Sequence, residues 1–266
     1  MAWWGKLLGG AFGYLVGGPL GALLGAAFGH QFDRGIDDIA SNPFQPGAQE
    51  RVQTAFFTAL FSVLGHLAKA DGRVSESEIR MARELMQHMQ LGDDMRKVAM
   101  RLFSEGKQPG FPLADVLDQF RRECHRRRHL LQMFLEVLLQ AAYADGTLDP
   151  AERRVLNQVR TAFGFSEAEF VRLEVLVRNA ARFASDANWR GEPAGGDTLK
   201  QAYELLGVPS NSSDEAVKKA YRRLMNRHHP DKLVSKGLPE QMIRLATEKT
   251  QEIKKAYELV MQARQK

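Results

Sequence analysis

Cysteine is almost absent from this chain of 266 residues, in which Cys124 is the only one. A single cysteine excludes an intramolecular disulfide and any zinc site made of several cysteines. The sequence also lacks a glycine-rich phosphate loop, an EF-hand loop and any Ser/His/Asp or Cys/His arrangement of the kind used in nucleophilic catalysis. We therefore expect a protein that is not an enzyme and that holds no cofactor.

Charged side chains are missing from one long stretch, Leu7–Gly29. As a helix this stretch would be about 34 Å long, enough to cross a bilayer core of roughly 30 Å. A secretory signal peptide has a shorter apolar run, and a buried soluble helix would not contain so much glycine, although both remain alternatives. The sequence thus predicts a short N-terminus at 1–6, a transmembrane helix at 7–30 and a juxtamembrane loop at 31–50.

Glycine recurs at every fourth position through this stretch. Small residues at that spacing let the backbones of membrane helices approach closely. A step of four residues turns a helix by about 400°, so the glycines drift around the helix and one partner cannot contact them all. We therefore predict a homodimer or a higher oligomer that forms through the membrane helix. The glycines assigned to this contact are Gly9, Gly13, Gly17, Gly21 and Gly25.

No strand-like pattern follows the loop "SNPFQPG" at 41–47, and the middle of the chain has helical periodicity throughout. Segments 52–79 and 130–156 each predict a buried helix, a sharp Asp-Gly turn and a second helix. The two turns, Asp71-Gly72 and Asp145-Gly146, are 74 residues apart. The residues around them also align, which indicates an internal repeat.

The turn of each repeat allows two interpretations. In the first, glycine adopts a positive φ, Ser75 or Asp149 caps the next helix, and a glutamate three residues later closes a capping box. In the second, four carboxylates converge on a divalent cation; these are Asp71, Glu78, Asp145 and Glu152. We favour capping, because nothing else supplies the roughly six oxygens that such an ion takes. The repeat resembles the TerB-like, or tellurite-resistance, helical domain over residues 51–183.

Arginine and histidine cluster in "RRECHRRRH" at 121–129. A nucleic-acid-binding patch would interleave aromatic residues with the basic ones, and this cluster has none. We therefore interpret it as a solvated junction between two helices and expect no nucleic-acid partner.

All of the excess charge lies at the C-terminal end. Residues 1–196 carry equal numbers of basic and acidic side chains, so residues 197–266 hold the whole net charge of +5. A polar segment with Gly and Pro at 184–196 predicts a linker in front of this basic module.

The basic module predicts three helices. The first ends at Gly207, the second is capped by Ser213 or Asp214 and ends before Pro230, and the third starts at Pro239. The apolar stripe of the second helix consists of Val217, Ala220, Tyr221 and Leu224, and that of the third of Ile243, Ala246, Ile253, Ala256, Tyr257 and Val260. A basic stripe projects from another sector of the second helix and consists of Lys218, Lys219, Arg222, Arg223 and Arg227.

The segments "YELLGV", "VKKAYRRL", "HPD" and "EIKKAYELV" follow one another in this module, which resembles the J domain of DnaJ-type co-chaperones. Without that resemblance the basic stripe would be a solvated or phosphate-binding face, and His229 with Asp231 would suggest a metal site or an acid–base pair. The resemblance implies an antiparallel helical hairpin that docks on a DnaK-type chaperone and triggers its ATP hydrolysis. It assigns signal transmission to His229, Pro230 and Asp231 and docking to the basic stripe.

The order of the three modules resembles that of membrane-anchored DnaJ-like co-chaperones. This implies an all-α chain with a transmembrane helix, a TerB-like domain and a J domain at 197–266. A DnaK-type chaperone, its nucleotide exchange factor and ATP are cytoplasmic in bacteria. The resemblance therefore implies an inner-membrane protein with a periplasmic N-terminus, cytoplasmic C-terminal domains and a part in the stress response. A metal-responsive or signalling membrane adaptor that uses the TerB-like domain stays as the alternative.

Overall fold

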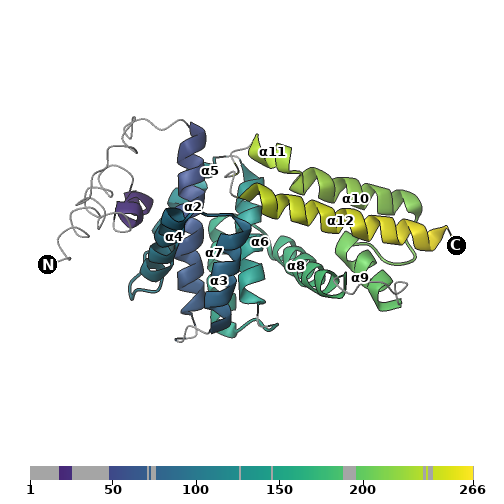
Figure 1. The fold of residues 1–266 in the computed structure, drawn as a ribbon, viewed down its shortest axis with the longest axis horizontal. Helices are drawn as coiled ribbons and strands as arrows, with labels where there is room; N and C mark the ends of the chain where they lie inside the picture. Colours follow the sequence, from purple (N-terminus) through teal and green to yellow (C-terminus); the bar gives the residue numbers. More distant parts are fainter. Residues whose placement is uncertain are drawn as a thin grey trace. The chain divides into compact units, whose positions relative to one another are not determined.

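The computed structural model describes residues 18–25, 48–70, 72, 76–125, 127–144, 146–187, 196–235, 238 and 242–265. As the sequence predicts, the regular elements of these residues are helices, with no strand among them (Figure 1). The chain divides into one compact unit of Met1–Phe165 with Gly237–Gln241, and a second of Ser166–Lys236 with Met242–Lys266. The helices of the first unit are α2 (Ala48–Ala68), α3 (Glu76–His88), α4 (Asp93–Gly106), α5 (Leu113–Cys124), α6 (Arg128–Ala142) and α7 (Pro150–Ala162). Those of the second unit are α8 (Glu167–Ala187), α9 (Gly196–Leu206), α10 (Asp214–His228), α11 (Pro230–Val234) and α12 (Ile243–Arg264).

Residues 18–25 form a short helical segment ahead of α2. Leu20 in this segment is buried, and its backbone N–H donates to Oε1 of Gln119 in α5 at 2.8 Å. Among the described residues, no helix combines the length and the apolar content needed to span a bilayer. Most of the transmembrane helix predicted at 7–30 lies outside the described residues, and so do Gly9, Gly13 and Gly17.

Helix α2 is the buried centre of the first unit. Its sequence is apolar around the whole circumference, a pattern typical of a helix enclosed on all sides. The Phe56 side chain has no exposed surface, and its ring lies 5.7 Å from that of Phe120 in α5 and 5.8 Å from that of Phe134 in α6. Each Å² of apolar surface removed from water stabilises the folded state by about 25 cal/mol. Because the three rings bury their surfaces against one another, they hold α5 and α6 against the N-terminal half of α2.

Helices α2 and α4 cross with their backbones in contact. A Cβ atom added to Gly65 of α2 would lie 1.9 Å from the carbonyl oxygen of Phe103. A Cβ atom added to Gly106 of α4 would lie 1.8 Å from the carbonyl oxygen of Ser62. Each glycine thus leaves the space that the backbone of the other helix fills.

The two repeat turns have the same backbone geometry. Gly72 and Gly146 both have a φ of +91°, a conformation that glycine adopts without a steric penalty. After the second turn, the carboxylate of Asp149 accepts from the N–H of Ala151 at 2.6 Å, and the carboxylate of Glu152 accepts from the N–H of Asp149 at 3.1 Å. This is the capping box that the sequence predicts at the start of α7.

Helix α8 packs with the C-terminal helices and is longer than the sequence predicts. It continues to Ala187, four residues into the expected linker at 184–196. Leu176 and Ala180 are buried in one apolar cluster with residues of α9, α10 and α12. This packing places α8 with the helices that follow it. The structural division at Phe165 therefore differs from the predicted domain 51–183 by this one helix.

Helices α10 and α12 form the predicted hairpin. The Ser213 hydroxyl accepts from the N–H of Ala216 at 3.2 Å and so caps α10, which ends at His228, before Pro230, as expected. The ring of Tyr221 stacks on that of Tyr257 in α12, with 4.2 Å between centroids. The start predicted for the third helix, Pro239, lies outside the described residues; α12 is described from Ile243.

The C-terminus of α12 is fastened to the rest of the hairpin by Arg264. Its guanidinium donates to the Tyr203 hydroxyl at 2.8 Å, to the Asp214 carboxylate at 2.7 Å and to the Ser210 carbonyl at 3.2 Å. One side chain therefore joins α12 to the end of α9 and the start of α10, which fixes α10 relative to its neighbours.

Candidate functional site

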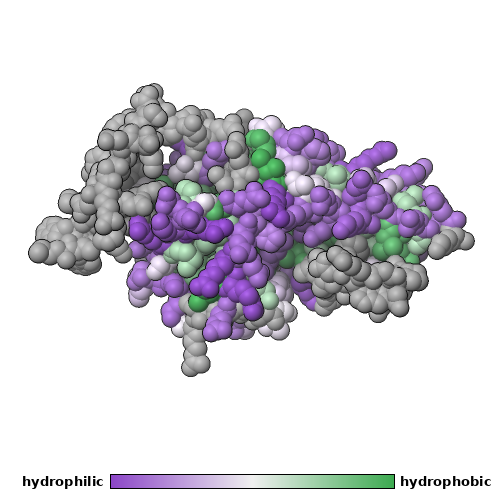
Figure 2. Space-filling model, viewed as in Figure 1, coloured by the Kyte–Doolittle hydropathy of each residue, from purple (hydrophilic) through white to green (hydrophobic). Residues whose placement is uncertain are grey.

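The basic stripe lies on the face of α10 that points away from the core of the second unit. Lys218, Lys219, Arg222 and Arg223 are exposed and Arg227 is half-buried. In the apolar stripe on the other side of the helix, Tyr221 is half-buried and the other three residues are buried. No ion pair joins these five side chains to an acid within the described part of the chain. Figure 2 shows hydrophilic residues over α10 and α12. We call these five residues the basic face of α10.

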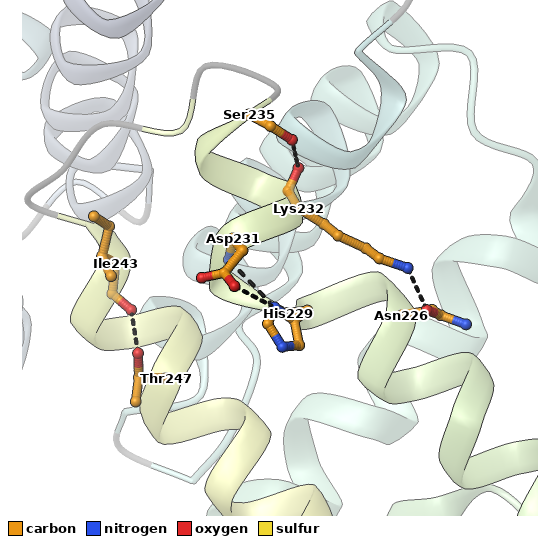
Figure 3. A network of polar contacts seen from close by, with 7 residues as sticks. All are labelled: Asn226, His229, Asp231, Lys232, Ser235, Ile243 and Thr247. Carbon is orange, nitrogen blue, oxygen red and sulfur yellow. Dashed lines mark hydrogen bonds and ion pairs between the residues drawn. The ribbon is translucent and has the colours of Figure 1, made fainter.

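His229 lies at the end of this helix and forms the N-cap of α11 (Figure 3). Its backbone is extended, with φ −59° and ψ 122°, as expected for a residue before proline. The N–H of Asp231 donates to Nδ1 of His229 at 3.3 Å. Pro230 and Asp231 form the first turn of α11, a short helix that the sequence analysis does not predict. That short helix persists because Leu233 is buried and anchors it.

The imidazole and the carboxylate of this turn both face solvent. The side chain of His229 is 43% exposed and that of Asp231 is 88% exposed, and Nδ1 lies 3.9 Å from a carboxylate oxygen of Asp231. Nδ1 already accepts the backbone N–H of Asp231, so Nε2 is the ring nitrogen that remains for a partner. The turn thus presents this nitrogen and the Asp231 carboxylate to solvent.

Three polar residues beside the turn carry no signal in the sequence. The Lys232 ammonium donates to Oδ1 of Asn226 and so links α11 to the last turn of α10 (Figure 3). The Ser235 hydroxyl donates to the carbonyl of Lys232 at 3.0 Å at the other end of α11. The sequence alone does not indicate this link. Residues 226 and 232 are six positions apart, a spacing that does not bring two side chains together on one helix, and they meet here because a second helix begins at Pro230.

Most of the alternative metal site lies outside the described residues. Asp71 and Asp145 lie outside those residues, and so does the side chain of Glu78. Glu152 is engaged in the capping box of α7. In the described parts of the chain, no group of three or more His, Cys, Asp or Glu side chains is placed to hold a metal ion.

Cys124 is fully buried at the end of α5. Burial raises the pKa of its thiol to about 12, so the side chain stays protonated at neutral pH. Since the thiolate is the reactive form of cysteine, this residue has no nucleophilic role in the folded protein.

Sequence comparisons agree with the order of the modules. The family model of the DnaJ domain matches residues 201–266, which contain the basic face of α10 and the tripeptide turn. The model described as tellurite resistance protein TerB matches residues 57–175, and that of the co-chaperone DjlA transmembrane domain matches residues 1–47. No solved structure matches the chain. The fold and the turn thus define a J-domain protein with a TerB-type domain and a transmembrane module.

Three relatives define the family more closely. The chain is 42% identical over 273 residues to co-chaperone protein DjlA of Photobacterium profundum, covering 97% of both chains. It is 43% identical to the protein of that name from Coxiella burnetii, covering 99% of both chains. It is 40% identical to that of Legionella pneumophila, covering 98% of this chain and 96% of the relative. The chain therefore belongs to the DjlA family of co-chaperones, as its sequence features indicate.

Proposed function

We propose that the J domain recruits a DnaK-type chaperone and stimulates its ATP hydrolysis through His229, Pro230 and Asp231. The observation that supports this is the position of the tripeptide. Its imidazole and carboxylate are exposed, the imidazole accepts the N–H of Asp231, and both groups lie at the end of a basic helix face that forms no ion pair within the described residues. A partner with an acidic surface is attracted to the basic face of α10 and meets the turn in a defined orientation.

In this function the chain itself is not an enzyme, because the ATP is bound and hydrolysed by the partner. Lys218, Lys219, Arg222, Arg223 and Arg227 orient the chaperone, and the tripeptide acts on its nucleotide cycle. A nucleotide exchange factor acting on the chaperone completes that cycle. The chain needs no cofactor for its part.

Replacing His229→Gln tests the central step. Glutamine cannot reproduce the imidazole geometry, while Leu233 still anchors α11, so the fold is expected to persist. We expect stimulation of a DnaK-type ATPase in single-turnover assays to fall to the unstimulated rate, with an unchanged circular dichroism spectrum and melting temperature. Ser235→Ala, at the exposed end of the same short helix, is the matched control and keeps full stimulation. Full stimulation by a folded His229→Gln protein would overturn the proposal.

We also propose that residues 7–30 span the bacterial inner membrane, with residues 1–6 periplasmic and the two folded units cytoplasmic. The match of residues 1–47 to a transmembrane domain supports the anchor. The hydrogen bond between Leu20 and Gln119 is the observation against it, because a residue inside the bilayer cannot contact α5.

Alkaline extraction of membranes that contain the full chain separates these two arrangements. An anchored chain stays in the membrane pellet, and protease added to the cytoplasmic side then removes the J domain while that added to the periplasmic side does not. Release into the supernatant would favour the packing of residue 20 on α5 and overturn the anchor.

A further inference from the structure

The start of α2, the end of α5, the start of α6 and the end of α7 lie at the same end of the first unit (Figure 1). The rings of Phe56, Phe120 and Phe134 contact one another, with 4.7 Å between the centroids of the last two. Phe120 lies four residues before the end of α5, and Phe134 lies six residues after the start of α6. Arg128 at the start of α6 donates to the carbonyl of Gly164 at 3.4 Å, just after α7 ends. The start of α2 and the α5–α6 junction therefore share this end.

The α5–α6 junction is strongly basic. Between Gln119 and His129 the sequence has five arginines and one acid, Glu123. Those in the described residues are Arg121, Arg122, Arg127 and Arg128, which we call the junction arginines. The first turn of α6 contains no acidic residue, so the positive end of its dipole adds to the charge of the junction.

Local acids compensate only part of this charge. Asp118 serves two arginines, with Arg121 at 2.8 Å and Arg122 at 3.3 Å. The hydrogen bond from Arg121 lowers the pKa of Asp118, so the carboxylate is charged and offsets one of its two partners. The side chains of Arg121 and Arg122 remain 51% and 67% exposed. One guanidinium nitrogen of Arg127 is buried, and Arg128 lies over a neighbouring phenyl ring. Arg121 and Arg122 are therefore the arginines that the junction presents most openly to solvent.

Helix α2 begins at Ala48, directly after the residues 1–47 that match a transmembrane domain. The end of the first unit that carries the junction is therefore the end closest to the bilayer along the chain. Basic residues within a Debye length of an anionic leaflet are attracted to it, and that length is about 8 Å at physiological ionic strength. The junction has no interleaved aromatic side chains on which nucleic-acid bases could stack.

We propose that Arg121 and Arg122, the exposed arginines of this junction, contact anionic phospholipid headgroups of the membrane in which the chain is anchored. This contact orients the TerB-type unit on the bilayer surface. The inference rests on the proposed anchor, and its experiment is chosen so that the two can fail separately.

The test uses the full chain reconstituted into vesicles of phosphatidylcholine, with or without phosphatidylglycerol. A fluorophore is attached at the junction through Glu123→Cys, since the buried Cys124 does not react, and a lipid with a nitroxide headgroup is the quencher. We expect several-fold stronger quenching with phosphatidylglycerol than without it, and loss of this difference at high salt. The same label attached through Gln108→Cys, on an exposed turn before α5, is expected to show no lipid dependence.

Charge reversal identifies the responsible residues. Arg121→Glu with Arg122→Glu is expected to remove the lipid dependence of quenching. Arg96→Glu with Lys97→Glu on α4 is the matched control, because these are also adjacent, exposed cations that pair with acids three residues earlier. The control is expected to retain it.

Each outcome decides the inference. If the chain incorporates into vesicles but its label is quenched equally with and without phosphatidylglycerol, this inference alone is overturned. The same holds if both charge reversals change the quenching equally. A chain that fails to incorporate overturns the anchor and this inference with it. Displacement of the label from anionic vesicles by a short oligonucleotide, with loss of oligonucleotide binding in the Arg121→Glu, Arg122→Glu protein, would assign the junction to nucleic acid instead.

Discussion

At the scale of single residues, Gly65 and Gly106 determine how closely two helices of the TerB-type unit approach. Each lies opposite a backbone carbonyl of the other helix, so neither position has room for a side chain. A flexible side chain could rotate away from an added methyl group, whereas a backbone carbonyl inside a helix cannot. A substitution at either position therefore lowers the stability of the unit, because the two helices must move apart.

Replacing Gly65→Ala is expected to destabilise the first unit by about 3 kcal/mol or more, because overpacking of a closed core costs about 1–3 kcal/mol even where side chains can move. Chemical denaturation followed by circular dichroism measures this loss. Gly92→Ala is the control, since a Cβ atom there meets nothing within 4 Å, and it is expected to change stability by about 1 kcal/mol or less. Equal effects of the two substitutions would contradict the close crossing.

At the scale of the element, the two sides of α10 have different roles. One side packs into the core and stabilises the fold, and the other is exposed and available to a partner. Val217, Ala220 and Leu224 are buried, while the basic face on the other half makes no ion pair within the described residues. A surface of this kind acts on a partner over long range, and such attraction mainly changes the rate of association.

Replacing Arg222→Glu and Arg223→Glu together is expected to slow association with a DnaK-type chaperone about tenfold or more at low salt, and less at high salt. Stopped-flow or surface plasmon resonance measurements across a salt series check this. Lys254→Glu with Lys255→Glu on α12 introduces the same charge change away from the basic face and is expected to have a smaller effect. A loss of affinity that is independent of salt would mean that the face does not act electrostatically.

Helix α8 provides a second test at this scale, because its C-terminal half packs into the core of the J-domain unit. Leu176→Ala is expected to destabilise that unit by about 2–5 kcal/mol, the usual cost of truncating a buried leucine. Val175→Ala, one residue earlier and 46% exposed, is expected to change stability by about 0.5 kcal/mol or less. Thermal unfolding with a reporter in the J domain measures both. An unchanged unfolding transition of the J domain in the Leu176→Ala protein would mean that α8 belongs to the TerB-type unit instead.

At the scale of the whole molecule, we predict that the glycine-rich N-terminal stretch associates one chain with another in the membrane. A simple anchor needs only apolar length, which leucine provides without the helix penalty of about 1 kcal/mol per glycine. Glycine at every fourth position instead favours close packing between membrane helices.

Replacing Gly17→Leu and Gly21→Leu is therefore expected to preserve membrane insertion but to reduce self-association in a membrane two-hybrid assay. Substitution of Leu8, Leu15 or Leu23 by alanine is the control and is expected to leave association intact. If the double leucine protein associates as strongly as the parent, the glycines do not form an interface and the segment only anchors the chain.

Features that depend on neighbours within one or two helical turns follow from the amino-acid sequence alone. The cap at Ser213, the capping box of Asp149 and Glu152, the stop before Pro230 and the buried stripe of α10 all lie where the sequence places them. Each of these depends on residues within seven positions of one another, and the local chain holds such residues together. The tripeptide beside its basic helix belongs to the same group, which is why the J domain is recognisable from its sequence.

Features that join distant segments depend instead on the tertiary fold. Gly65 meets Phe103, Arg264 reaches Tyr203 across 61 positions, and Leu176 joins the core of the J-domain unit. Nothing local distinguishes Gly65 from a helix-weakening glycine, or α8 from the last helix of the repeat. Burial depends on the partner as much as on the residue itself, so the packing of α8 with α9 and the helical form of α11 follow from the cores that these helices join.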